Sequence, residues 1–262
     1  MEKYRMGSTM NQSVVNGILQ GYKNYIEERK AKKEEMHIST AYAWVKGNHI
    51  DDQTAEECKE SGISFTKAKA GYTWGYLQFN IDNDKRMFII KNAKYFDEDD
   101  FPHRKDVRGQ KHKASDKETY LKRLSRINSN VDFPEEPTLF PEEKENKIMS
   151  IFGDETLKEL EDPQARELEY KFNQFYIITY EIDESFAISN IRMLMPNPDN
   201  DKAYEVENLS KFIGTSTVTF DENDYEALAE DGFDVPDTPA ATEYDIVLQE
   251  ELFDDDKKGE EK

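Results

Sequence analysis

The sequence predicts an α+β protein in which two helix-plus-antiparallel-hairpin units pack as one body and a disordered acidic tail follows. Helical periodicity opens each half of the chain, and aromatic and β-branched runs separated by turn residues follow it. After residue 220 apolar residues thin out and acids dominate, which is typical of a disordered segment. At 262 residues the chain suffices for one large domain or two small ones.

Helices begin the first half. Residues 11–30 place apolar side chains at helical spacing, although Gly17 and Gly21 each weaken a helix by roughly 1 kcal/mol relative to alanine. A short second helix is expected over residues 39–47, ending at Gly47, and a third helix follows Asp52 and stops at Gly62.

Strands come next. Residues 63–67 alternate in polarity, and residues 73–81 are aromatic-rich and β-prone. The polar residues 82–84 form a turn, and residues 85–91 return as a strand. This is the clearest hairpin in the sequence.

A basic stretch closes this half. Residues 103–126 hold nine Lys and Arg and three acids, and they change from a loop to a helix with Asp116 as N-cap. Residues 131–147, with three prolines and five glutamates, indicate a linker.

The second half repeats the order of helices and hairpin. We expect helices over 154–161 and 163–174, strands over 175–181 and 186–195, a short helix over 205–213 and a strand over 215–220. The chain thus divides into a basic N-terminal α+β region (1–130), the linker (131–147), a C-terminal α+β region (148–220) and the acidic tail (221–262).

The net charge of −21 is unevenly distributed. Residues 1–130 carry a balance of +5, whereas residues 131–262 carry −26. The tail, residues 221–262, accounts for −14 of this. A uniformly acidic protein would repel nucleic acid, but this basic region can bind it locally.

Several function classes are excluded or left without support. No apolar run is long enough to span a membrane, and the first residues lack the apolar core of a secretory signal, so we expect a cytoplasmic protein. A single cysteine, Cys58, excludes a disulfide framework, and its glutamate neighbours favour an inert thiol. No metal-ligand or phosphate-loop motif occurs, so we expect no metal and no cofactor.

A metal-dependent nuclease is a weak alternative. Asp82 or Asp84 with Lys91 partly matches the acid and lysine pattern of such enzymes. The acid expected two residues before Lys91 is Ile89, so the pattern is incomplete, and the catalytic residues stay unknown.

The most suggestive signal interleaves cations with aromatic rings. Cations neutralise phosphates and aromatic faces stack on bases, so we predict a nucleic-acid or partner-binding surface. An alternative stays open, in which the rings form a core strand and the cations balance the acidic tail. The predicted binding residues are Lys67, Lys69, Tyr72, Trp74, Lys91, Lys94, Arg104, Lys105, Arg108, Lys111, Lys113, Lys122 and Arg123.

Six short segments occur in an order that resembles the ClpXP-sensitive toxin family of Gram-positive bacteria and their phages, which overlaps uncharacterised prophage proteins. The resemblance spans roughly residues 11–215 and excludes the tail. No segment is a catalytic signature. The segments are 41–48 (AYAWVKGN), 69–79 (KAGYTWGYLQF), 88–96 (FIIKNAKYF), 124–128 (LSRIN), 178–183 (ITYEID) and 195–198 (MPNP).

The resemblance implies the toxin half of a toxin–antitoxin pair. Its partner would be a repressor that joins a helix-turn-helix domain to a metallopeptidase-like domain, and a cytoplasmic unfoldase–protease would degrade the toxin. We therefore predict a growth-inhibiting toxin, or a phage-defence relative, that acts on nucleic acid or on a nucleic-acid-binding machine. The alternative is a phage or mobile-element anti-defence protein that inhibits a host factor, with the acidic tail as a mimic of nucleic acid.

Overall fold

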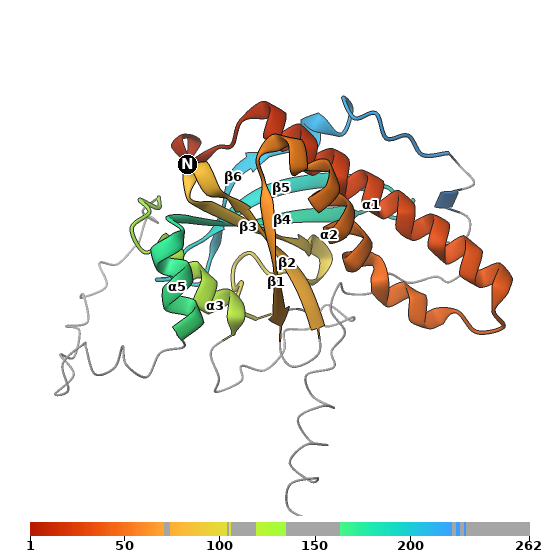
Figure 1. Ribbon diagram of the computed structural model, residues 1–262, viewed down its shortest axis with the longest axis horizontal. Coiled ribbons are helices and arrows are strands. Elements are labelled where there is room, and N and C mark those ends of the chain that lie inside the picture. The colour runs from red at the N-terminus through yellow and green to blue at the C-terminus, as the bar shows by residue number, and fades with distance from the viewer. Residues whose placement is uncertain are drawn as a thin grey trace, which may run out of the picture.

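A computed structural model describes residues 1–70, 74–103, 105, 119–134, 163–221, 224–225 and 228. Its centre is a six-stranded sheet with helices on both faces (Figure 1). The helices are α1 (Ser8–Glu35), α2 (Lys46–Glu57), α3 (Tyr120–Ser125) and α5 (Pro163–Lys171). The strands are β1 (Ser64–Ala70), β2 (Trp74–Ile81), β3 (Arg86–Asn92), β4 (Gln174–Ile182), β5 (Ile188–Pro196) and β6 (Ala203–Asn208).

The two halves of the chain share one sheet. The strand order is β1-β2-β3-β4-β5-β6, so each half supplies three neighbouring strands. Neighbours are antiparallel except at the centre, where β3 and β4 run parallel and Phe88 lies beside Tyr176. The predicted α+β class is therefore confirmed, and the two helix-and-hairpin units form one body.

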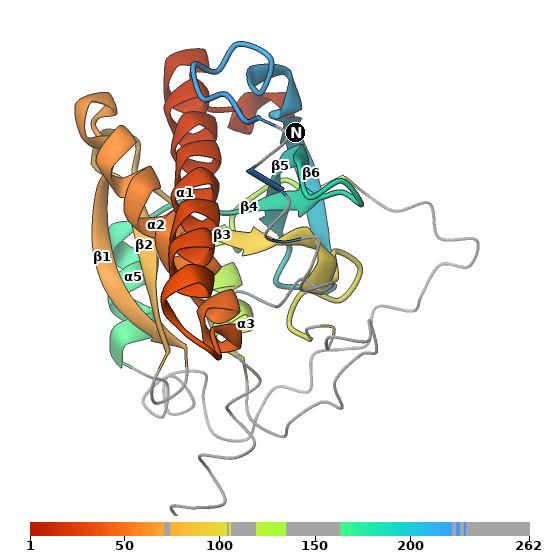
Figure 2. The same cartoon turned by 90° about the vertical axis from the view of Figure 1, so that its right-hand side faces the viewer.

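Successive side chains of the central strands point to opposite faces of the sheet. Along β3, Phe88 and Ile90 join a core with α1 and α2, whereas Met87 and Ile89 join a core with α3 and α5. The sheet consequently has a helical layer on each face (Figure 2). Burial on both faces explains the long apolar runs of the central strands.

Two glycines allow α1 to touch α2. A Cβ atom at Gly17 would lie 2.4 Å from the Thr54 Cα atom, and one at Gly21 would lie 2.5 Å from the His49 carbonyl oxygen. The residues that weaken α1 in isolation are therefore required for its close contact with α2.

The helix expected over residues 39–47 forms as two helical segments, and the helix expected over 205–213 is wrong. The first was expected over residues 39–47, but Thr40–Val45 form a 3₁₀ helix and α2 begins at Lys46 and continues through Gly47. The second was expected over 205–213, where β6 pairs with β5 as an edge strand, and no strand forms over 215–220. Pairing with a neighbouring strand overrides the local helical pattern at β6.

The helix of the basic stretch begins later than expected. Thr119 is the N-cap of α3, and its side chain accepts a hydrogen bond from the Lys122 backbone N–H. The expected cap, Asp116, lies outside the described residues. The expected helix over 154–161 and residues 135–147 of the linker lie outside them as well.

The start of the acidic tail packs on α1. The Phe220 ring stacks on Tyr225 at 5.7 Å between centroids, and the Lys30 Nζ atom lies 3.0 Å from Asp224. Leu228 is buried in the core beside α1. Core packing thus reaches beyond residue 221, and the tail from residue 229 lies outside the described part of the chain.

Candidate nucleic-acid interface

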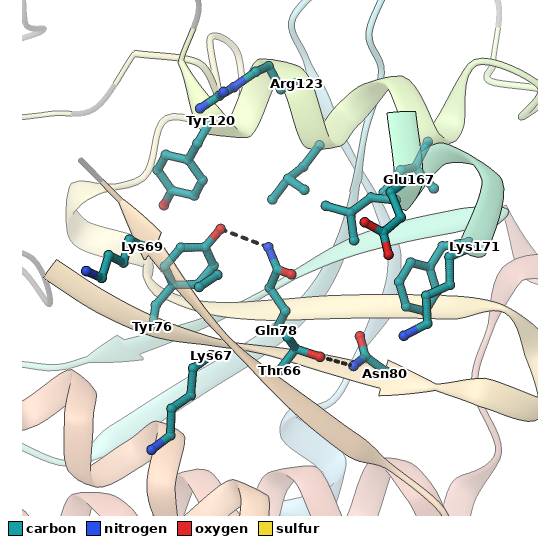
Figure 3. A pocket seen from close by; sticks show the side chains of 15 residues that line it. Thr66, Lys67, Lys69, Tyr76, Gln78, Asn80, Tyr120, Arg123, Glu167 and Lys171 are labelled. Carbon is teal, nitrogen blue, oxygen red and sulfur yellow. Dashed lines mark hydrogen bonds between the residues drawn. The ribbon is translucent and has the colours of Figure 1, made fainter. Parts of the chain in front are cut away.

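A cavity of about 520 Å³ lies between the β1–β2 hairpin and helices α3 and α5 (Figure 3). Strand residues line one side, and helical residues from the second layer line the other. The lining residues are Thr66, Lys67, Ala68, Lys69, Tyr76, Gln78, Asn80, Tyr120, Arg123, Leu124, Ile127, Glu167, Leu168, Lys171 and Phe172.

Polar side chains line the strand side of the cavity. Tyr76, Gln78 and Asn80 alternate along β2 and so share one face of the sheet. The Gln78 amide nitrogen donates to the Tyr76 hydroxyl at 3.0 Å. The Asn80 amide nitrogen donates to the Thr66 hydroxyl at 2.9 Å. Both amides are buried, so these bonds hold their orientation.

Two tyrosines form one end of the cavity. The rings of Tyr76 and Tyr120 lie 5.3 Å apart at an angle of 45°. The Lys91 Nζ atom lies 5.7 Å from the Tyr76 ring centroid and 5.4 Å from that of Tyr120, within the range of cation–π attraction. Burial, and then the neighbouring Tyr120, raise the pKa of the Tyr76 phenol, so this hydroxyl stays protonated at neutral pH.

The cavity lining is positively charged, although the whole chain is acidic. Its charged lining side chains, of which the two lysines of β1 lie at the edge, comprise four cations and one carboxylate. They are Lys67, Lys69, Arg123, Lys171 and Glu167. Glu167 and Lys171 are one turn apart on α5, and both lie at the end of the cavity away from the tyrosines (Figure 3). An anionic ligand that carries a flat ring would match this arrangement of charge and aromatic faces.

The pairing of β1 with β2 places the predicted lysines of β1 on the opposite face of the sheet from Tyr76, Gln78 and Asn80. Thr66 and Ala68 face Gln78 and Tyr76 across the ladder, so Lys67 and Lys69 alternate onto the opposite face. Figure 3 shows the Lys67 ammonium group directed away from the two amides. These lysines line the cavity at its edge and remain exposed.

Arg123 lines the cavity from α3, and Lys91 lies at its tyrosine end, but other predicted cations have different partners. Lys122 pairs with Asp201, Lys105 lies 3.8 Å from Asp97, and Lys94 lies over the Tyr95 ring. Trp74 begins β2, and its side chain lies outside the described part of the structure. Also outside it are Tyr72, Arg104, Arg108, Lys111 and Lys113.

The prediction from sequence omitted the polar residues of β2 and most of the lining residues of α3 and α5. Gln78 and Asn80 carried a usable signal, because polar residues recur at every second position of an otherwise apolar strand. Tyr120 and Lys171 carried none, because only the packing of α3 and α5 brings them to the hairpin.

The described residues give the nuclease alternative no metal centre. Within them, no group of three or more His, Cys, Asp or Glu side chains is placed to hold a metal ion. The Asp84 carboxylate lies 3.9 Å from Arg86, and Lys91 faces the two tyrosine rings. The side chain of Asp82 lies outside the described part.

Cys58 is fully buried, and its environment suppresses thiolate formation. Burial first, and then the charge of Glu57, raise the pKa of this thiol to about 12. Desolvation therefore has a larger effect than the flanking glutamates that the sequence suggested, and the thiol is not a nucleophile at neutral pH.

Among the helices that the structure describes, none has the length and apolar character needed to cross a membrane. A sequence model of a protein family matches residues 7–261, and that family is described as "Family of unknown function (DUF5986)". No curated protein and no solved structure matches the chain. The match spans nearly the whole chain, the acidic tail included, but its description assigns no chemistry.

Proposed function

Because the chain belongs to the DUF5986 family, whose description names no activity, we propose its function from the cavity: it binds single-stranded nucleic acid. One nucleotide enters between the β1–β2 hairpin and helices α3 and α5. The observation that carries the proposal is the pair of tyrosine rings, Tyr76 and Tyr120, at one end of a cationic cavity.

The ring pair supplies a surface on which a base can stack. Stacking of a base on an aromatic side chain contributes about 1–3 kcal/mol and tolerates any base. Both rings are half-buried, and the Lys91 Nζ atom lies 5.4 Å from the Tyr120 centroid. Arg123 and Lys171 place positive charge along the path of the phosphates.

The dimensions favour a single strand over a duplex. A cavity of about 520 Å³ lies within the range of roughly 300–1,000 Å³ found for small-ligand sites. It admits one flat base, whereas the bases of a duplex are stacked and paired and present only their edges.

The proposed biological consequence is growth inhibition in the cytoplasm, relieved by a protein partner. Its support is the ordered set of segments that resembles the ClpXP-sensitive toxins. Segment 69–79 contains the lining residues Lys69, Tyr76 and Gln78, and segment 88–96 contains Lys91, which lies beside the tyrosine rings. A protein that sequesters single-stranded nucleic acid would interfere with replication, transcription or translation.

Fluorescence anisotropy with labelled single-stranded oligonucleotides tests the binding proposal. We expect Tyr120→Ala to weaken binding about 5- to 150-fold, from the loss of one stacked base. Tyr170→Ala is the matched control, because that ring is 86% exposed and outside the cavity. A mononucleotide and a duplex of the same sequence are the further ligands. Equal binding of the two alanine variants, both shown to be folded by thermal melting, would refute the proposal.

Arg123→Ala tests the electrostatic part of the same proposal. We expect weaker binding and a salt dependence reduced by roughly one phosphate contact, about 0.7 in the slope of log K against log salt. Lys59→Ala removes one exposed charge outside the cavity and serves as its control. An unchanged salt slope for Arg123→Ala would show that no phosphate lies beside this residue.

Viable counts after controlled induction test the biological consequence. We expect a loss of viability with the natural chain and protection by Tyr120→Ala at equal protein level. Full viability with clear accumulation of the natural chain would contradict a growth-inhibiting role while leaving the binding proposal intact.

A further inference from the structure

Two side-chain oxygens in the cavity have no hydrogen-bond partner among the residues that the structure describes. They are Oε1 of Gln78 and Oδ1 of Asn80, whose residues are 6% and 3% exposed. Both oxygens keep contact with solvent. Because their residues line the cavity, the two oxygens face into it.

The amide nitrogens of the same residues are held inside the protein. Gln78 donates to the Tyr76 hydroxyl and Asn80 to the Thr66 hydroxyl (Figure 3). In this arrangement each amide has its nitrogen toward a strand neighbour and its oxygen toward the cavity. The cavity consequently presents two acceptors and no amide donor from this side.

We propose that the cavity selects a nucleobase that carries an exocyclic amino group, and that Gln78 and Asn80 accept its two N–H bonds. This selection rests on the proposed binding of single-stranded nucleic acid. Cytosine is the clearest pyrimidine case, because its N4 amino group offers two donors from one nitrogen. Uracil replaces that group with an oxygen acceptor and keeps a single ring N–H.

The spacing of the two residues fits one amino group. Gln78 and Asn80 occupy successive positions on one face of β2, about 6.6 Å apart along the strand. Two acceptors on one amino nitrogen lie about 5 Å apart when each N···O distance is about 2.9 Å. A convergence of about 1.6 Å between the two side-chain ends brings both oxygens to one amino nitrogen.

Burial makes the selection strong. A base without the amino group would leave at least one buried acceptor unpaired and would place its own oxygen against the amide oxygens. Tyr76 and Tyr120 stack on either base equally well, so the difference between bases comes from the two amides.

The test compares short oligocytidine and oligouridine of equal length by fluorescence anisotropy, using the full chain. We expect cytidine to bind at least about fivefold more tightly than uridine. Gln78→Met and Asn80→Leu remove the acceptors at similar side-chain volume, and each variant should lower the affinity for cytidine to near that for uridine. Thermal melting confirms that both variants are folded.

The outcomes separate this inference from the binding proposal. Equal or tighter binding of uridine by the natural chain, with both ligands weakened by Tyr120→Ala, would overturn the selection and keep the binding. A cytidine preference that survives both amide variants would overturn the assignment of Gln78 and Asn80. Binding of neither oligonucleotide would refute both proposals.

Discussion

Replacement of Gly21 by alanine tests the contact between α1 and α2. The added Cβ atom would lie 2.5 Å from the His49 carbonyl oxygen and 2.6 Å from the Ile50 Cα atom. Both atoms belong to the α2 backbone, so neither can rotate away as the end of a flexible side chain can. The two helices must therefore separate by about 1 Å to restore ordinary van der Waals contact.

Two opposing effects determine the free energy of unfolding of this variant. Alanine favours the helix over glycine by about 1 kcal/mol. Overpacking of a close contact costs about 1–3 kcal/mol, and the rigid backbone here places the cost near the upper value. The net loss is about 2 kcal/mol, which corresponds to a decrease in Tm of about 4–8 °C for a chain of this size.

Urea unfolding and thermal melting measure this loss, with Gly214→Ala as the control because a Cβ atom there meets nothing within 4 Å. The double variant Gly17→Ala with Gly21→Ala should cost less than the sum of its parts, because one separation of the helices relieves both clashes. A Gly21→Ala variant at least as stable as the natural chain would refute this account of the contact.

Three further predictions concern stability. Asn128→Ala should lower the free energy of unfolding in urea by about 3 kcal/mol. The Asn128 side chain accepts from the Phe175 N–H at 2.7 Å and donates to the Phe175 and Pro196 carbonyls at 2.9 Å each. An unchanged urea midpoint would contradict this prediction. A chain ending at residue 221 should melt lower than one ending at residue 230, because only the shorter chain lacks the Lys30–Asp224 ion pair and the buried Leu228; equal melting would contradict this. Burial lowers the pKa of His49 below its ordinary value of 6.5, so the unfolded chain takes up a proton first as pH falls. Stability should therefore decrease as pH falls through 6.5 and decrease less in His49→Gln, and parallel pH profiles of the two proteins would rule this out.

The candidate site was partly visible in the sequence. Interleaved lysines and aromatic residues indicated the hairpin, and Lys67, Lys69 and Arg123 do line the cavity. The sequence did not show which way these side chains point, because the pairing register of β1 with β2 decides which of them face the cavity. Lys122 shows the same difficulty, since its partner Asp201 is 79 residues away in the sequence.

Local patterns by themselves determined the fold class, the long first helix and the central strands. The run at 175–178 is apolar without interruption, and such runs indicate strands buried on both faces wherever they occur. The uneven distribution of charge along the chain was also evident, because counting the charged residues of the sequence is enough to find it. These properties depend on neighbours in the sequence, which the chain carries before it folds.

Only the tertiary structure decided what depends on distant residues. It made residues 203–208 an edge strand through pairing with β5, and it turned two helix-weakening glycines into the contact of α1 with α2. It also formed the cavity, by bringing α3 and α5 against a hairpin that lies about 50 to 100 residues earlier in the chain. Pairing and packing energies belong to surfaces that meet only after folding, so no window of adjacent residues contains them.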